Sequence, residues 1–139
     1  MNDTDSSSTT PASFKAPLSI LVVEDNAINL RLITAALLRA GHRVDSAANG
    51  SVALGKFDQN NYDVILMDIM MPVMDGLTAT KEIRKIEQIR NIPAEKRIKI
   101  IAITANAFED DRNKFFEAGM NYYMNKPVEI EELNRILNL

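Results

Sequence analysis

Five short apolar segments alternate with longer amphipathic segments from residue 18 onwards. The apolar segments read LSILVV at 18–23, RVDSA at 43–47, YDVILM at 62–67, IKIIAI at 98–103 and NYYM at 121–124. Three of them are nearly continuous runs, as is typical of strands buried on both faces of a parallel sheet. The alternation predicts an α/β fold in which right-handed crossovers carry a helix between successive strands.

The segments between the strands show the spacing of helices. The first of them ends before Gly41, which we expect to be its C-cap, and its apolar positions are Ile28, Leu32, Ala35, Ala36 and Leu38. Further helices are expected at about 50–58, 76–90, 107–118 and 129–138. The stretch 86–97 is long for a connection, and Pro93 should divide it into a helix extension and a loop.

Residues 1–17 differ from the rest in composition, because Ser, Thr, Asp and Pro dominate and apolar residues are few. Such a stretch buries too little surface to offset its ordering entropy, so we expect a flexible tail or interdomain linker. Residues 18–139 then form one domain, as the length of 139 residues and 46% hydrophobic content suggest.

Composition narrows the function classes. A net charge of -3 gives no support to nucleic-acid binding, and the lack of cysteine excludes disulfides and thiolate metal sites. We expect no membrane contact, because no run of about 18 apolar residues occurs. A secretory signal is also missing, so the expected location is cytoplasmic.

Polar side chains follow the predicted strands at their carboxyl ends, which meet at one edge of a parallel sheet. Each alone has an ordinary explanation as a helix cap, a turn residue or a solvated charge. Their convergence indicates a site. The residues are Glu24 and Asp25 after the first strand, Asp68 after the third, Thr104 after the fourth, and Asn125, Lys126 and Pro127 after the fifth.

These residue types suit one kind of chemistry. Three carboxylates placed close together resist ionisation, and a hard divalent cation such as Mg²⁺ removes their repulsion. One carboxylate can then attack phosphorus and form an aspartyl phosphate. The metal, the ammonium group of Lys126 and the hydroxyl of Thr104 can each bind phosphoryl oxygens.

The stretches ILVVEDNAINLRL, DVILMDIMMPVMDGL, IIAITANAF and AGMNYYMNKPV resemble the receiver domain of bacterial and fungal two-component response regulators. The resemblance covers about residues 18–139, with the motifs in the order and spacing of that family. It implies a flavodoxin-like (βα)5 fold, a doubly wound five-stranded parallel sheet of order 2-1-3-4-5. It also implies a signalling phosphoacceptor that assists its own phosphorylation and dephosphorylation, and not an enzyme.

The resemblance assigns a role to each site residue. Asp68 is the phosphoacceptor, and Glu24, Asp25, Asp68 and the backbone carbonyl of Met70 hold Mg²⁺, for which Mn²⁺ can substitute. Glu24 departs from the two aspartates of many receivers, but its longer side chain can act through a water. The remaining roles are Thr104 as switch hydroxyl, Tyr123 as switch aromatic, Lys126 as phosphoryl contact, Lys126–Pro127 as a cis peptide, and Met70 and Asn106 as positions that tune phosphoryl lifetime.

The expected partner is the phosphohistidine of a sensor kinase or a histidine phosphotransfer domain, and the receiver is expected to be a monomer. Ile28 and Leu32, early in the first helix, are the expected partner interface. We expect no DNA-binding output module after Leu139, which leaves a stand-alone receiver or the C-terminal receiver of a hybrid sensor histidine kinase. The sequences EDNAIN, MDIMMPVMDG and ITANAF favour the hybrid kinase, and the receiver would then lie in the cytoplasmic part of a membrane-bound protein.

Three other functions are compatible with a fold of this class, but the residues disfavour each of them. A haloacid-dehalogenase-type phosphatase needs a second aspartate two residues after its nucleophile, and Met70 occupies that position. A flavodoxin-like binder would carry a Ser, Thr and Gly-rich first loop, where this chain has EDNAIN. A degenerate receiver acting as a scaffold would lack the acceptor or the lysine, and both are present. His42 is expected to be structural and Asp75 to cap a helix.

Overall fold

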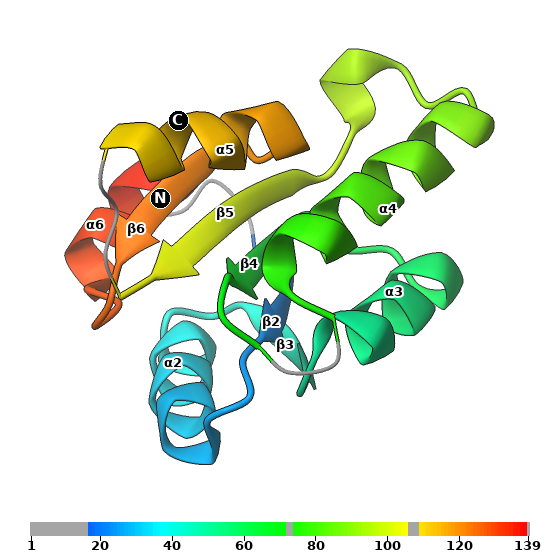
Figure 1. The fold of residues 1–139 in the computed structure, drawn as a ribbon. Coiled ribbons are helices and arrows are strands. Elements are labelled where there is room, and N and C mark those ends of the chain that lie inside the picture. The colour runs from blue at the N-terminus through cyan, green and yellow to red at the C-terminus, as the bar shows by residue number, and fades with distance from the viewer. Residues whose placement is uncertain (1–16, 72–73, 106–108, 139) are drawn as a thin grey trace.

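The computed structural model describes residues 17–71, 74–105 and 109–138, in which five parallel strands alternate with five α-helices (Figure 1). The strands are β2 (Ser19–Val23), β3 (Arg43–Ala47), β4 (Val64–Asp68), β5 (Lys99–Thr104) and β6 (Tyr122–Asn125). The helices are α2 (Ala27–Arg39), α3 (Gly50–Gln59), α4 (Gly76–Ile89), α5 (Glu109–Ala118) and α6 (Ile130–Leu137), with a short 3₁₀ helix, η1 (Ala94–Lys96), before β5. The predicted tail lies almost wholly outside the described residues and stays a prediction.

The sheet has the order β3-β2-β4-β5-β6 with every pairing parallel, which confirms the predicted order 2-1-3-4-5. β4 is buried along its whole length, and β2 and β5 are buried except toward their first residues. Strands of this kind must be covered on both faces by helices. The continuous apolar runs in the sequence therefore identified the interior strands correctly.

Two layers of helices cover the sheet (Figure 1). On one face, α3, α4 and α5 pack against alternate strand residues through Ala53, Phe57, Ala79, Ile83 and Phe115. On the other face, α2 and α6 pack through Ile33, Leu37 and Leu133. Each strand residue points to the face opposite its neighbour, so the two cores are separated by the sheet itself.

The outer side of α2 carries apolar residues, including Ile28 and Leu32 of the predicted partner interface. Ile28, Leu32 and Leu38 are exposed, and the buried residues of α2 are Ile33 and Leu37. The sequence EDNAINLRLITAALL is apolar around much of its circumference, so spacing alone could not select the buried side. The consequence is an apolar surface on the outer side of α2.

Side-chain caps fix where the helices begin. Asn26, Asn49 and Asp75 each accept a hydrogen bond from the backbone N–H three residues later, at 2.8 to 2.9 Å, and the capping role predicted for Asp75 is confirmed. The predicted C-cap glycine, Gly41, follows α2 with a φ of 98°. Pro93 separates the end of α4 from η1, as predicted.

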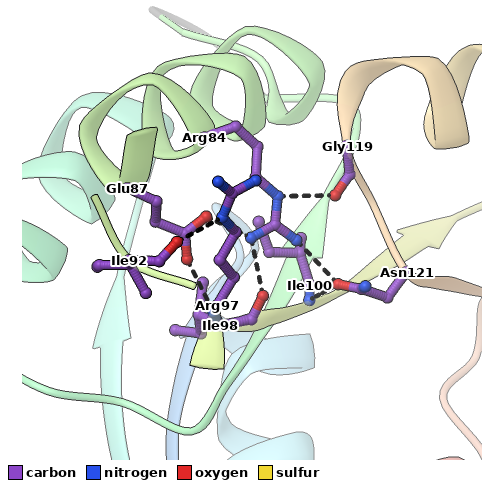
Figure 2. A network of polar contacts seen from close by, with 8 residues as sticks. All are labelled: Arg84, Glu87, Ile92, Arg97, Ile98, Ile100, Gly119 and Asn121. Atoms are coloured by element: carbon purple, nitrogen blue, oxygen red, sulfur yellow. Dashed lines mark hydrogen bonds and ion pairs between the residues drawn. The ribbon is translucent and has the colours of Figure 1, made fainter. Parts of the chain in front are cut away.

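A polar network joins α4 to the amino end of β5 and to the loop before β6 (Figure 2). The Arg84 guanidinium forms an ion pair with Glu87 at 2.6 Å and donates hydrogen bonds to backbone carbonyl oxygens of Ile98 and Gly119, both at 2.9 Å. It also donates to the Asn121 side chain at 2.9 Å. The network therefore links three segments that are far apart in the sequence.

Two further features belong to this network: a second hydrogen bond to Glu87 and a glycine packed closely against Arg84. Glu87 is 1% exposed and accepts a hydrogen bond from the Ile98 N–H at 2.8 Å, so its charge is buried but paired. Gly119 has a φ of 111°, and a Cβ built there would lie 2.7 Å from Cγ of Arg84. Only glycine satisfies both the backbone conformation and the close approach of the arginine.

Candidate functional site

The predicted site residues meet at the carboxyl edge of the sheet. Asp68 and Thr104 are the last residues of β4 and β5, so each of these strands ends one residue later than the sequence predicted, and Glu24 directly follows β2. Register places Asp68 beside Ile103, and the Lys126 N–H donates to the Thr104 carbonyl at 2.7 Å. These backbone contacts hold the ends of neighbouring strands together.

Three carboxylates form the centre of the site. One oxygen from each of Glu24, Asp25 and Asp68 lies within 4.8 Å of the others. Glu24 is 2% exposed and Asp68 is 1% exposed, whereas Asp25 is exposed to solvent. The Lys126 ammonium lies 3.0 Å from Oδ2 of Asp68 and 3.5 Å from Oε1 of Glu24, so a single cation serves two buried carboxylates.

This shortage of positive charge perturbs the titration of the site. Burial, together with the neighbouring Asp68 carboxyl, raises the pKa of Glu24 to about 7, although the Asn26 N–H and the Lys126 charge act in the opposite direction. Burial alone would lower the pKa of Lys126. The hydrogen bond to Asp68 and the charges of Asp68 and Glu24 outweigh burial and raise that pKa overall.

The donor set fits a divalent cation that prefers oxygen ligands. Oε2 of Glu24 accepts a hydrogen bond from the Asn26 N–H at 3.1 Å, but buried Oε1 accepts none from the part of the chain that the structure describes. A buried carboxylate oxygen without a donor is costly unless a cation or a proton satisfies it. The exposed Asp25 leaves one side of the site open to water, as Mg²⁺ sites usually require.

The start of α4 lies directly against the backbone of Asp68. A Cβ built on Gly76 would clash with the Asp68 carbonyl oxygen and lie 2.9 Å from Cγ of Met67. The Met70 N–H donates to Oδ1 of Asp68 at 3.2 Å, and the Met70 side chain is exposed beside the site. Glycine at position 76 thus lets the helix approach the acceptor closely.

Thr104 and Tyr123 lie on the same face of the sheet. Tyr123 pairs with Ala102, two residues before Thr104, and packs against the core formed with α4 and α5. The Tyr123 hydroxyl accepts a hydrogen bond from Nη1 of Arg112 at 2.8 Å. Sequence reasoning missed Arg112, which is one charged residue among many on a polar helix. The Lys126–Pro127 peptide is cis, as predicted, and Asn106 lies outside the described residues.

A groove opens beside the carboxylates, between α2 and the loop after β6. Its cavity has a volume of about 310 Å³, and apolar residues of α2 and of the loop line most of it, together with Glu24 and Lys126. Leu32 lines this groove and is 66% exposed. Ile28, one turn earlier on α2, is 68% exposed, so neither residue belongs to the core.

The fold and the site together define an α/β domain with an acidic, metal-compatible pocket at the switch point of its sheet. The family model for the response regulator receiver domain matches residues 20–138. The chain therefore belongs to that family, and it is a receiver domain of two-component phosphorelay signalling.

Curated and solved relatives agree with this assignment. The chain is 40% identical over 121 residues to hybrid signal transduction histidine kinase L of Dictyostelium discoideum, a match that covers 85% of this chain and 7% of that protein. The chain thus spans only a small part of this curated relative. Among the helices of the described residues, none has the length and apolar character needed to cross a membrane.

Two solved structures are informative about the site. One is the receiver domain of the response regulator Ssk1, crystallised with the histidine phosphotransfer protein Ypd1 of Saccharomyces cerevisiae. It has a TM-score of 0.82 and 28% identity to this chain, and the match covers 88% of this chain and 87% of that chain. The other is the receiver domain of sensor histidine kinase PA1611 of Pseudomonas aeruginosa, which has a magnesium ion in its active-site cleft. It has a TM-score of 0.76 and 46% identity, with coverage of 88% and 96%.

Proposed function

We propose that Asp68 accepts a phosphoryl group from a phosphohistidine, with Mg²⁺ held by Glu24, Asp25, Asp68 and the backbone carbonyl of Met70. The observation that carries the proposal is the placement of buried Asp68 between two further carboxylates and the Lys126 ammonium, 3.0 Å away. The magnesium ion bound in the PA1611 receiver supports the metal assignment. Mn²⁺, with the same preference for oxygen ligands, should substitute.

The transfer is a displacement at phosphorus. A carboxylate oxygen of Asp68 forms a bond to the phosphorus atom, while the bond from phosphorus to the histidine nitrogen breaks and its electron pair leaves with the imidazole. Bound Mg²⁺ would neutralise charge on the phosphoryl oxygens. Lys126 binds a second phosphoryl oxygen, and the Thr104 hydroxyl donates a hydrogen bond to a third.

A signalling role explains the site better than hydrolysis of a separate substrate. A phosphatase that uses an aspartate nucleophile needs a proton-transferring group beside it, and the side chain two residues after Asp68 is the exposed thioether of Met70. The aspartyl phosphate should therefore persist until water attacks it. Met70 and Asn106 remain the expected positions that tune its lifetime.

The proposed output is a shift between two conformations. As the Thr104 hydroxyl moves toward the phosphoryl group, it vacates space on the face of the sheet that it shares with Tyr123. Tyr123 then turns inward, which changes the surface formed by α5 and β6. Phosphorylation acts as a population shift, because the phosphoryl group makes tighter contacts in one of the two conformations.

The groove beside α2 is the proposed docking site for the phosphohistidine-bearing partner. Leu32 lines this groove together with Glu24 and Lys126, and Ile28 is exposed one turn earlier on α2. A contiguous apolar surface of this kind is typical of a partner-binding site. The Ssk1 receiver, to which this chain is similar, was crystallised with a histidine phosphotransfer protein. We infer a helix that packs its apolar face on α2, with Ile28 near the centre of the contact.

The hybrid-kinase relatives support placing this domain in a hybrid sensor histidine kinase. We propose that it lies in the cytoplasmic part of that protein, with residues 1–17 as the linker that precedes it. Within such a protein the receiver would act as a monomeric domain that exchanges phosphoryl groups with histidine-bearing partners. The input signal and the cognate partner are set by the other domains and by the surface of α2.

The metal-dependent chemistry is tested by incubating the chain with acetyl phosphate and recording intact mass. The wild type should gain one phosphoryl group with Mg²⁺ and none in excess chelator. Replacing Glu24 and Asp25 together by Asn should abolish the gain. Equal phosphorylation with and without Mg²⁺ would contradict the proposed metal site.

The docking surface is tested by comparing two phosphodonors. Ile28→Asp should strongly slow transfer from a phosphorylated histidine phosphotransfer domain but leave phosphorylation by acetyl phosphate nearly unchanged, because the chemistry at Asp68 is intact. Leu38→Asp is the matched control, since Leu38 is an exposed leucine at the other end of the same helix. Equal loss with both donors would indicate a folding role for Ile28, and no loss with either would place the interface elsewhere.

A further inference from the structure

Tyr123 is held by two side chains of α5 that are one helical turn apart. The Tyr123 hydroxyl accepts a hydrogen bond from Nη1 of Arg112 at 2.8 Å, and the guanidinium carbon lies 5.5 Å from the centre of its ring. The Phe116 ring contacts the Tyr123 ring edge-on, with centroids 6.2 Å apart and an angle of 68° between the planes. Residues four apart on a helix share one face, so the two side chains act on the tyrosine together.

These contacts are directional and involve the polar end of the tyrosine. Packing alone would satisfy the ring, but the hydroxyl is bound by a charged donor, and hydrogen bonds to charged groups are stronger than neutral ones. The guanidinium also lies within the distance at which a cation is attracted to an aromatic ring. Because these contacts hold the hydroxyl and the ring edge of Tyr123 against α5, we expect rotation of Tyr123 toward Thr104 to break them.

We propose that Arg112 is a latch: it holds Tyr123 against α5 and so restrains the conformational switch that phosphorylation of Asp68 drives. This inference rests on the proposed function, because it takes Tyr123 to be the switch aromatic. It adds a positioning residue that acts through Tyr123 and does not touch the phosphoryl group. Because the latch stabilises the conformation that phosphorylation disfavours, weakening it should tighten binding at Asp68, by at most the factor by which the latch favours that conformation.

The size of the effect follows from the contacts that are lost. Removing one net hydrogen bond between neutral groups corresponds to a change of about fivefold in an equilibrium constant, which sets the lower end of the range for this charged donor. Arg112→Met removes the hydrogen bond and the cation over the ring but keeps an unbranched side chain of similar length. The variant should therefore bind the phosphoryl mimic beryllofluoride, in the presence of Mg²⁺, at least about fivefold more tightly than the wild type.

The test follows Tyr123 directly in the full chain, labelled with fluorotyrosine and observed by ¹⁹F NMR during a beryllofluoride titration. The chain has 3 tyrosines, and Tyr123→Phe identifies the signal of interest. Without beryllofluoride, Arg112→Met should move the Tyr123 signal toward the position that the wild type reaches when saturated. Lys114→Met, an exposed position on the same helix, is the matched control and should change neither the signal nor the affinity.

The outcomes separate this inference from the proposed function. If the wild type binds beryllofluoride and its Tyr123 signal responds, but Arg112→Met has an unchanged signal and affinity, the latch is refuted. Weaker binding by Arg112→Met would also overturn it. Arg112→Lys keeps the charge and should restore part of the wild-type behaviour, and it carries the test if the methionine variant does not fold. If the wild type fails to bind beryllofluoride, the proposed function falls first and the latch with it.

Discussion

Replacing Arg84 by Met should destabilise the fold far more than replacing a neighbouring lysine that also has an ion pair on α4. Arg84 contacts the Glu87 carboxylate at 2.6 Å and donates three further hydrogen bonds, each at 2.9 Å (Figure 2). Without it, Glu87 keeps only the Ile98 N–H as a partner among these contacts and remains buried. Breaking a buried ion pair by removing one partner costs about 3–5 kcal/mol.

The control is Lys85, which pairs with Glu82 at 3.1 Å with the same spacing on the same helix, but with both side chains exposed. Exposed pairs contribute about 0–1 kcal/mol, so Lys85→Met should change stability little. Urea unfolding followed by circular dichroism gives the free energy of unfolding of both variants. Because that free energy is only about 5–15 kcal/mol for a small domain, the loss expected for Arg84→Met is a large part of it. Adding Glu87→Gln to Arg84→Met removes the unpaired charge, keeps an acceptor for Ile98 and should recover part of the loss.

The network interpretation would be refuted if Arg84→Met and Lys85→Met lowered the free energy of unfolding by similar amounts. It would also fail if the double variant were no more stable than Arg84→Met alone. In that case Glu87 would carry no uncompensated buried charge once the arginine is removed.

Three further predictions concern single positions. Gly76→Ala should destabilise the domain by about 1–3 kcal/mol and slow phosphorylation of Asp68, because the new methyl group clashes with the Asp68 carbonyl oxygen. Gly55→Ala has open space around the new methyl group and should stabilise α3 by about 0.5–1 kcal/mol. Urea unfolding measures the stability of both variants. The raised pKa of Glu24 means that the metal-free fold loses stability as pH rises from 4.5 to about 7. Glu24→Gln should therefore be more stable than the metal-free wild type above pH 7, and it should lose stabilisation by Mg²⁺; thermal melts with and without Mg²⁺ measure both effects. Burial lowers the pKa of His42, so stability should decline as pH falls below 6.5, and thermal melts of His42→Gln should lack this slope.

The sequence predicted what depends on local pattern and on strand ends. Continuous apolar runs predicted the interior strands, and the polar residues after them predicted the cluster of Glu24, Asp68 and Lys126. These predictions succeed because parallel strands all present their carboxyl ends at one edge. Once the strands are identified, the site follows without knowledge of side-chain packing.

Contacts between segments that are distant in the chain could not be predicted. Arg84 meets Gly119 and Asn121 across 35 and 37 residues, and nothing near Arg84 distinguishes it from other arginines on exposed helices. The sequence left the buried side of α2 open, because the helix is apolar around much of its circumference, and only the packed structure shows that Ile33 faces the core while Ile28 does not. Arg112 was missed for a similar reason, since its role depends on Tyr123 being on an adjacent element.

We propose Asp68 as the residue that carries the phosphoryl group, and a chemical trap can identify that residue directly. Phosphorylation with acetyl phosphate and Mg²⁺, followed by borohydride reduction, converts an aspartyl phosphate into homoserine, with the loss of one oxygen and the gain of two hydrogens at that residue. Peptide mass spectrometry should find this change at Asp68 in the wild type and at no residue in Asp68→Asn. Homoserine at Asp25 or elsewhere, or an undiminished signal in the Asp68→Asn variant, would contradict the account.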